Sequence, residues 1–321
     1  MQLLFCPICG TKAYFHNLIC PCGADLYFDP EQGQFRTDGP ACANRERIAC
    51  NWVGERGLCR SCLMSPTIPP LSVEGNLELL AGAERGKRWV LANLARWGWF
   101  TDADADPGPR PQFLMLSERT GQQDDVRVMM GHQNGIITIN VVEADDEIRF
   151  HRKNRLGERY RSMVGHFRHE IAHFLFERLE VTPGFLPAFR PVFGDETQDY
   201  GAALARHYAA PRDPGEEFIT PYATAHPHED WAETCAHFLH LVDMTDSFMA
   251  SGLMAPQVPS KDYDAYADPD STRLFQIASV VALAVNDINR ALDNPDLYPF
   301  VLTPRIRQKL SFAHDWVTRP R

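Results

Sequence analysis

The sequence predicts an α+β protein in which a small cysteine-rich N-terminal domain precedes a larger, mostly helical domain that carries a small β-sheet. Three observations lead to this prediction. Eight of the nine cysteines lie between residues 6 and 62, apolar residues alternate between residues 113 and 142, and helical apolar spacing dominates from residue 158 onward. A chain of 321 residues is long enough to bury a core. We therefore expect domains at 1–66 and 67–321.

The cysteine spacing of the first domain predicts metal binding. Residues 6–10 read Cys-Pro-Ile-Cys-Gly, a knuckle in which two thiolates flank a tight turn and Gly10 lets the backbone curl under a metal ion. The Cys-Pro-Cys of residues 20–22 is typical of a returning knuckle, although it is one residue short. In a reducing compartment, thiols this crowded favour metal over disulfides.

The simplest partition of the eight thiols is sequential, with four in each group. The first group is then Cys6, Cys9, Cys20 and Cys22, and the second is Cys42, Cys50, Cys59 and Cys62. An interleaved pairing also fits the spacing, and His16 is an alternative to one sulfur of the first group. Four thiolates form a structural zinc set, so we expect two structural zinc ions whose binding supplies the folding energy of this small segment.

The first part of the second domain is predicted to contain one helix and three strands. A proline-rich linker at 63–75 precedes a helix at 76–100, which has apolar residues at helical spacing. Strands are expected at 113–116, 126–130 and 136–142, the last two joined through residues 131–135, where Asn134-Gly135 marks a tight turn.

A His-Glu-x-x-His motif lies on the next predicted helix, at 158–180. Residues four apart share one face of a helix, so His169 and His173 can direct two imidazoles at one metal ion. Glu170 lies one step around the helix, which suits a carboxylate that takes a proton from water at the metal. This spacing is typical of zinc peptidases, with the histidines as ligands and the glutamate as base.

A catalytic zinc needs a third protein ligand, and the sequence offers two carboxylates downstream. We favour Glu229, near the start of a helix that begins at His226-Pro227, because Glu233 follows one turn later and can receive the spare N–H of a zinc-bound histidine. Glu196 is the alternative. The remaining predicted elements are an alanine-rich helix at 201–209 and packing helices at 271–293 and 303–316, with residues 245–270 rich in loops.

These stretches together resemble a family of bacterial zinc-binding metallopeptidases that carry an N-terminal zinc ribbon. The matching segments are 5–10, Cys42-Ala-Asn, Cys50-Asn-Trp, Gly165-His-Phe-Arg-His-Glu-Ile-Ala-His, Phe193-Gly-Asp-Glu with Asp199-Tyr200, and His226-Pro-His-Glu-Asp-Trp-Ala-Glu-Thr with His237. The resemblance covers nearly the whole chain. It implies a zincin-like peptidase domain with His169 and His173 as ligands and Glu170 as base.

Two functions follow from this reading. The first is a zinc-dependent peptidase with one catalytic zinc, in which Tyr200 or Tyr222 stabilises the oxyanion. The second is a non-catalytic scaffold or regulator whose zinc ribbon binds a protein partner. In that case a fourth protein ligand, His166 or His237, should close the helical metal site.

Charge and hydropathy exclude other partners. The net charge of −10 and the isoelectric point near 5.6 argue against a nucleic-acid surface or an anionic membrane surface, and no apolar run is long enough to span a membrane. The first residues lack the basic start and apolar core of a signal peptide, so we expect a cytoplasmic protein that acts on peptides or proteins.

Overall fold

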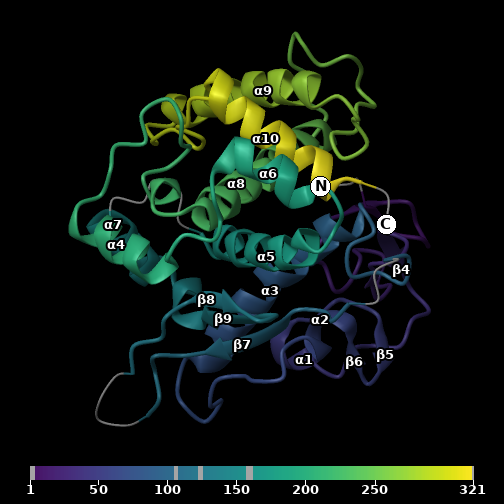
Figure 1. The fold of residues 1–321 in the computed structure, drawn as a ribbon. Helices are drawn as coiled ribbons and strands as arrows, with labels where there is room; N and C mark the ends of the chain where they lie inside the picture. Colours follow the sequence, from purple (N-terminus) through teal and green to yellow (C-terminus); the bar gives the residue numbers. More distant parts are fainter. Residues whose placement is uncertain (1–3, 105–107, 122–125, 157–161, 320–321) are drawn as a thin grey trace. The chain divides into compact units, whose positions relative to one another are not determined.

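The computed structural model describes residues 4–104, 108–121, 126–156 and 162–319 (Figure 1). Its elements confirm the predicted fold class, because helices dominate and the strands form small sheets. The chain divides into two compact units, Gln2–Phe167 and Arg168–Arg319, and the division falls inside helix α5 (Met163–Glu180). This division does not test the domain boundary that we expect at residue 66, which stays a prediction.

The cysteine-rich segment folds as short antiparallel strand pairs joined by turns. The pairs are β1 (Leu4–Phe5) with β2 (Lys12–Ala13), β3 (Tyr27–Asp29) with β4 (Gln34–Arg36), and β5 (Gly54–Arg56) with β6 (Leu58–Cys59). Two single-turn helices, α1 (Arg45–Ile48) and α2 (Arg60–Leu63), complete it. Strands this short cannot hold their register by hydrogen bonds alone. The segment therefore depends on other cross-links.

A three-stranded sheet follows helix α3 (Asn76–Ala95) in the first unit. Its order is β7 (Gln112–Leu116), β9 (Ile136–Asn140), β8 (Gly131–Gln133), with β7 parallel and β8 antiparallel to the central strand. Phe113 pairs with Ile137 and Met115 with Ile139, and all four side chains are fully buried. The alternation read from the sequence therefore identifies the core face of this sheet.

The predicted strand at 126–130 is wrong. The strand begins at Gly131, because the Asn134-Gly135 turn closes a two-residue hairpin that places Gln133 opposite Ile136. Both turn residues have positive φ, 50° and 77°, as such hairpins require. The third strand also ends earlier than expected, at Asn140, whose side chain accepts a hydrogen bond from Val142 N (3.2 Å) and starts the 3₁₀ turn η1 (Val141–Ala144). Helix α4 (Asp146–Leu156) comes next.

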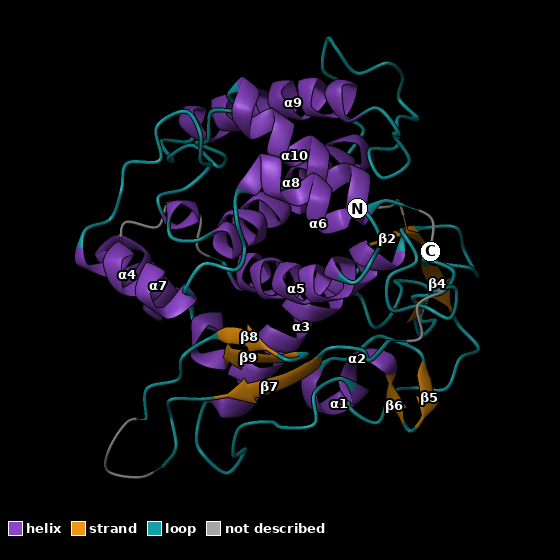
Figure 2. Ribbon diagram, viewed as in Figure 1, coloured by secondary structure: helices purple, strands orange, loops and turns teal. Residues whose placement is uncertain are grey.

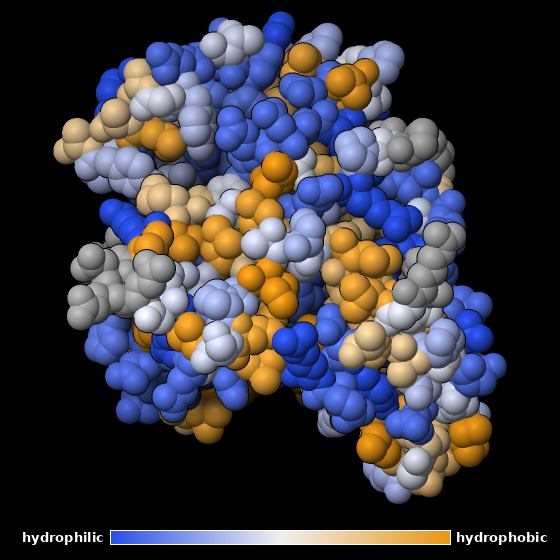
Figure 3. Space-filling model, turned by 90° about the horizontal axis from the view of Figure 1, so that it is seen from below, coloured by the Kyte–Doolittle hydropathy of each residue, from blue (hydrophilic) through white to orange (hydrophobic). Residues whose placement is uncertain are grey.

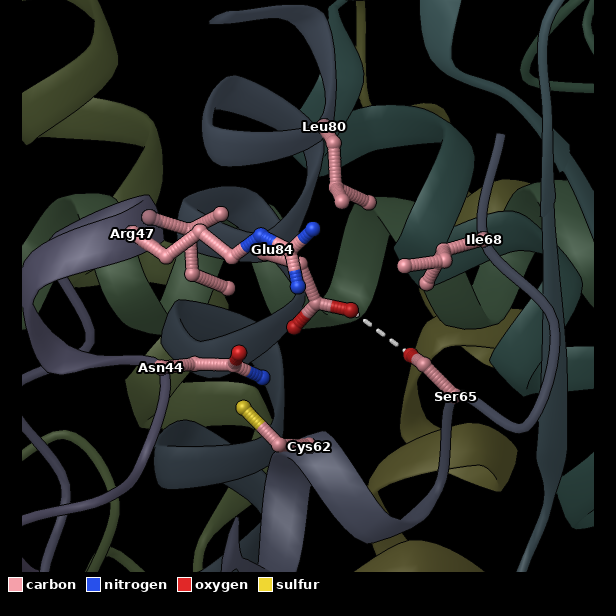
Figure 4. A pocket seen from close by; sticks show the side chains of 8 residues that line it. Asn44, Arg47, Cys62, Ser65, Ile68, Leu80 and Glu84 are labelled. Atoms are coloured by element: carbon pink, nitrogen blue, oxygen red, sulfur yellow. Dashed lines mark hydrogen bonds between the residues drawn. The ribbon is translucent and has the colours of Figure 1, made fainter. Parts of the chain in front are cut away.

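A buried ion pair connects α3 to α2, the helix that carries Cys62. Lys87 and Glu84 are almost completely buried, and Lys87 Nζ lies 2.8 Å from Glu84 Oε1. The ammonium also donates to Ser61 O (2.8 Å) and to Ser65 Oγ. Figure 4 shows the Ser65 hydroxyl bonded to Glu84 at the edge of a cavity of about 30 Å³ that Cys62 also lines. The pair therefore holds α2 through both its backbone and its flanking side chain.

We expect Lys87→Met to lower the free energy of unfolding of the first unit by about 3–5 kcal/mol, because it leaves the Glu84 carboxylate buried without its counter-charge. Urea denaturation followed by circular dichroism measures this loss. The double variant Glu84→Met with Lys87→Met removes both charges and should lose much less. A single variant as stable as the wild type would show that the pair contributes nothing.

The second unit is helical (Figure 2). After α5 it contains α6 (Phe185–Phe193), α7 (Tyr200–Ala209), the 3₁₀ turn η2 (Tyr222–Thr224), α8 (Pro227–Ala250), α9 (Ser271–Ala291) and α10 (Pro304–Val317). Helix α6 was not predicted. Of its two prolines, Pro187 lies in the first turn, where a missing N–H costs nothing, and Pro191 lies inside the helix. Helix α8 continues past the predicted loop start at 245, because Phe248 and Met249 are buried with Ile277 in one apolar cluster.

Helix α8 forms the centre of this unit. Trp231, Cys235 and Phe238 are fully buried, and Trp231 Nε1 donates to Ala172 O of α5 (2.7 Å). An aromatic cluster with ring centroids 4.7–6.3 Å apart packs α6, α8 and α10 on α5: Phe176, Phe185, Phe189, Phe193, Trp231, Phe312 and Trp316. Buried aromatic contacts of this kind fix the separation of the helices. They therefore set where side chains of α5 and α8 can meet.

The surface is mixed in character. On the face drawn in Figure 3, hydrophobic residues lie among polar and charged ones. Within the described ranges, the helices are too short or too polar to cross a membrane.

Candidate active site

Helix α5 presents two imidazoles on one face. His169 and His173 lie four residues apart, and their Nε2 atoms are 3.2 Å apart. The rings are nearly perpendicular, with centroids 4.9 Å apart. Two ring nitrogens that approach edge to edge are poor partners for each other unless a proton or a cation lies between them. Their arrangement is that of two ligands of one ion.

Glu229 of α8 meets the two histidines. Its carboxylate is buried, and Oε2 lies 3.1 Å from His169 Nε2 and 3.5 Å from His173 Nε2. Oε2 accepts no well-aligned hydrogen bond from the described residues, so it is a buried acceptor in need of a cation. Two imidazoles and one carboxylate are a zinc donor set, and the three ligand atoms lie within 4.8 Å of one another. The residues therefore fit a zinc ion.

The charges around this group favour a cation. Burial alone lowers the pKa of His169, but the adjacent carboxylates of Glu229 and Glu233 outweigh it and raise that pKa well above its usual range. Burial raises the pKa of Glu229, and the charges of His173 and His169 outweigh it in the opposite direction. The raised pKa of His169 shows that the carboxylates stabilise positive charge at its ring, and the lowered pKa of Glu229 shows that its carboxylate stays charged, as the ligand of a cation must.

Glu233 holds His169 in place through Nδ1, the ring nitrogen that does not face Glu229. Its Oε1 lies 2.7 Å from His169 Nδ1, so it accepts the spare ring N–H and leaves Nε2 for a metal. Its Oε2 accepts a hydrogen bond from Thr220 Oγ1 (2.7 Å). Nothing in the sequence pattern pointed to Thr220, because it lies in the loop before η2 and shares no periodicity with the helix.

The two tyrosines proposed as oxyanion donors both lie beside this group. Tyr200 begins α7, and its hydroxyl donates to Glu229 Oε1 (2.5 Å). The ring of Tyr222 lies 5.9 Å, centroid to centroid, from the ring of His169. Burial, with the charge of Glu229, raises the pKa of both phenols, so both stay protonated hydrogen-bond donors at neutral pH. The catalytic roles assigned to them stay predictions.

Glu170 is buried on α5, with an exposed fraction of 7%. Its charge is among the causes that raise the pKa of Tyr200, the phenol that contacts Glu229. The position next to His169, one step around the helix, matches that expected of a base beside the metal. Its role as a base stays a prediction.

The alternative ligands lie elsewhere. Glu196 forms an ion pair with Arg190, 2.6 Å between Oε1 and Nη2. His166 lies 3.5 Å from Glu143, and His237 Nδ1 lies 2.9 Å from the hydroxyl of Tyr298. Among the described residues, the helical donor group therefore consists of His169, His173 and Glu229.

The eight N-terminal thiols come together in the sequential partition, as Cys6, Cys9, Cys20, Cys22 and as Cys42, Cys50, Cys59, Cys62. Neighbouring sulfurs are 3.5 Å (Cys9–Cys20) and 3.8 Å (Cys6–Cys22) apart in the first group, and 3.5 Å (Cys50–Cys59) and 3.7 Å (Cys42–Cys62) apart in the second. Four sulfurs at about 2.3 Å from a tetrahedral zinc would lie about 3.8 Å apart. Both groups therefore fit zinc, and all nine cysteines are reduced.

The shortened knuckle closes without help from His16. Cys20 N donates to Ala24 O and Gly23 N to Cys20 O, both at 2.8 Å, and Gly23 takes the positive φ of 88° that this tight turn needs. His16 packs instead between the rings of Phe15 and Trp89, at 4.9 and 5.5 Å. The four cysteines therefore form the first group, and the alternative in which His16 replaces a sulfur is wrong, because its imidazole is part of an aromatic cluster.

Comparison with known proteins identifies the family of this chain. Residues 76–316 match the family described as "Putative zinc-binding metallo-peptidase". The chain belongs to this family. Its relatives include uncharacterized proteins of Mycobacterium bovis (strain ATCC BAA-935 / AF2122/97) and Mycobacterium tuberculosis (strains CDC 1551 / Oshkosh and ATCC 25618 / H37Rv). Each is 35% identical over 98% of this chain and 94% of the relative. No solved structure matches the chain.

The matched range contains all three donors of the helical group and Glu170, whereas the eight clustered thiols precede it. The description of the family therefore points to zinc binding and to a metallopeptidase at the level of the family. The resemblance read from the sequence is thereby confirmed.

Proposed function

We propose that this protein hydrolyses peptide bonds with a zinc ion held by His169, His173 and Glu229. The observation that supports this most directly is the donor group itself: three protein ligands lie together, and the Glu170 carboxylate lies on α5, the helix that carries both histidines. Within the described residues no fourth protein donor joins the group, and a catalytic zinc site keeps one position open. A structural site would be closed.

The bound ion would act as a Lewis acid and lower the pKa of a coordinated water to about 7. The remaining steps belong to the chain. Glu170 takes the proton of the attacking water and returns it to the leaving amine. Glu233 keeps His169 in the tautomer that offers Nε2, and the Tyr200 hydroxyl orients Glu229 through Oε1. We assign the oxyanion contact to Tyr222, the other phenol beside His169.

A peptide library tests this proposal. The purified chain is incubated with the library as isolated, after chelation, and after zinc is restored, and mass spectrometry identifies new termini. We expect cleavage by the first and third samples and none by the second, with about three zinc ions per chain by metal analysis. A metal-loaded chain that cleaves no peptide would overturn the peptidase and favour the scaffold.

We propose further that the ribbon binds a protein partner. Around the first cysteine group, four large apolar side chains are exposed: Phe5 (49%), Ile8 (68%), Tyr14 (68%) and Ile19 (58%). Exposed apolar residues gathered on one small module are typical of a protein contact.

The set of reduced thiols suits the cytoplasm, the compartment that we propose for this protein.

A further inference from the structure

A cavity of about 320 Å³ lies beside the candidate active site, lined by α7, the loop that follows it and the first turns of α8. Its walls combine two kinds of residue. Phe193, Phe218 and Pro227 provide apolar surface, and Arg206 and Arg212 provide positive charge. A cavity of this size with apolar walls and a few polar groups is typical of a ligand site.

The positive charge of the cavity is not compensated by protein groups. Arg206 and Arg212 are both exposed to solvent, and in the described part of the chain their guanidinium groups make no hydrogen bond or ion pair. Asp230, the acid that lines the cavity, is already neutralised by Lys309, 2.6 Å from Oδ2 to Nζ. The acidic residues of the neighbouring loop, Asp213, Glu216 and Glu217, are not among the lining residues. In a chain of net charge −10, two arginines without an ion-pair partner give this open cavity a local positive charge, which favours an anionic ligand.

The cavity and the donor group share structural elements. His207, which lines the cavity, has its ring 5.6 Å from that of Tyr222, and Tyr222 in turn contacts His169. Pro227 and Asp230 line the cavity from the same turn of α8 that carries Glu229. The cavity therefore lies within reach of a peptide whose scissile bond is held at the donor group.

We propose that the cavity binds a carboxylate of the peptide substrate, through Arg206 and Arg212. This inference rests on the proposed peptidase function. A guanidinium fork is the protein group best suited to a carboxylate. The carboxylate comes from an acidic side chain or from the peptide C-terminus, and both present the same chemistry to the two arginines.

Binding to the zinc-loaded Glu170→Gln variant tests the proposal without depending on turnover. Three fluorescent peptides of one sequence are compared by anisotropy. The first carries a glutamate and an amidated C-terminus, the second a glutamine and a free C-terminus, and the third a glutamine and an amide. We expect the first or the second to bind about 10- to 100-fold more tightly than the third, and the tighter one identifies the source of the carboxylate.

Arginine variants separate the cavity from the zinc ion, which also attracts carboxylates. Adding Arg206→Met with Arg212→Met should remove the preference, whereas Arg290→Met, at an exposed arginine of α9, should keep it. Equal binding of the three peptides, no binding of any, or a preference that survives the double substitution would each overturn the carboxylate site.

The two proposals fail separately. If the wild type cleaves the library without preference for acidic or C-terminal sites and the three peptides bind equally, the peptidase stands and the cavity assignment is wrong. If the carboxylate peptides bind through Arg206 and Arg212 but the wild type cleaves nothing, the anion site stands and the peptidase is wrong.

Discussion

Glu170→Gln is expected to lower peptide hydrolysis by about 10²- to 10⁴-fold while leaving the zinc content of the chain unchanged. The amide keeps the shape of the side chain but cannot take a proton from the attacking water. The donor atoms of His169, His173 and Glu229 are untouched, so the metal should remain. Initial rates on a peptide identified from the library, together with metal analysis of the same preparation, measure both quantities.

A control substitution on the same helix separates the loss of a negative charge from the loss of the proposed base. Glu180→Gln removes the same charge from the last residue of α5, far along the helix from the histidines, and should keep wild-type rates. Thermal unfolding of the two variants should agree. If Glu170→Gln is as active as the wild type, Glu170 is not the base, and the mechanism proposed for this site is wrong.

The parts of the site that the sequence predicts are those set by helical repetition. His169 and His173 on α5, and Glu229 and Glu233 on α8, are each four residues apart, so their spacing alone places each pair on one face. Which carboxylate faces the histidines depends on packing between helices. Trp231 bonds α8 to the backbone of α5, and Glu196 is engaged by Arg190, so Glu229 meets the histidines.

The contacts that the sequence did not predict come from segments between the helices. Thr220 reaches Glu233 from a loop, and Tyr200 reaches Glu229 from the first position of α7. Neither position belongs to a repeating pattern, so no spacing argument could have found these contacts. The arginines of the cavity are a similar case: Arg206 lies in the last turn of α7 and Arg212 follows in the loop, and only the fold brings both to one cavity.

In the fold, as in the site, the elements set by a repeating pattern were predicted and the others were not. The alternating residues of β7 and β9 were read correctly because one face of that sheet is buried, which fixes every second side chain. The placement of β8 failed because the residues before Gly131 alternate weakly, and the hairpin turn, not the pattern, sets the register. Helix α6 was missed: Pro187 is tolerated in its first turn, whereas Pro191 lies inside the helix, where a proline is unfavourable.

Cys59→Ser is expected to remove one zinc ion per chain and to unfold the cysteine-rich segment around it. Cys59 is completely buried; its N–H donates to Cys42 Sγ (3.3 Å), and its sulfur accepts from Cys62 N (3.4 Å) at the start of α2. Structural zinc in small domains binds with about 10–16 kcal/mol, as much as the whole stability of a typical domain. The short strands of this segment cannot replace that energy.

The contrast between the two cysteine groups sharpens this prediction. All four thiols of the second group are buried, whereas Cys9 and Cys22 of the first are exposed. Cys9→Ser should therefore also lose one zinc, but with protection of α1 and α2 against hydrogen exchange largely kept. Cys235→Ala is the control for removing a buried thiol, because Cys235 belongs to neither group and its loss should leave the zinc content unchanged. Hydrogen exchange measured by mass spectrometry, with metal analysis, distinguishes the three variants. Wild-type zinc content and exchange in Cys59→Ser would show that the second group is not a structural metal site.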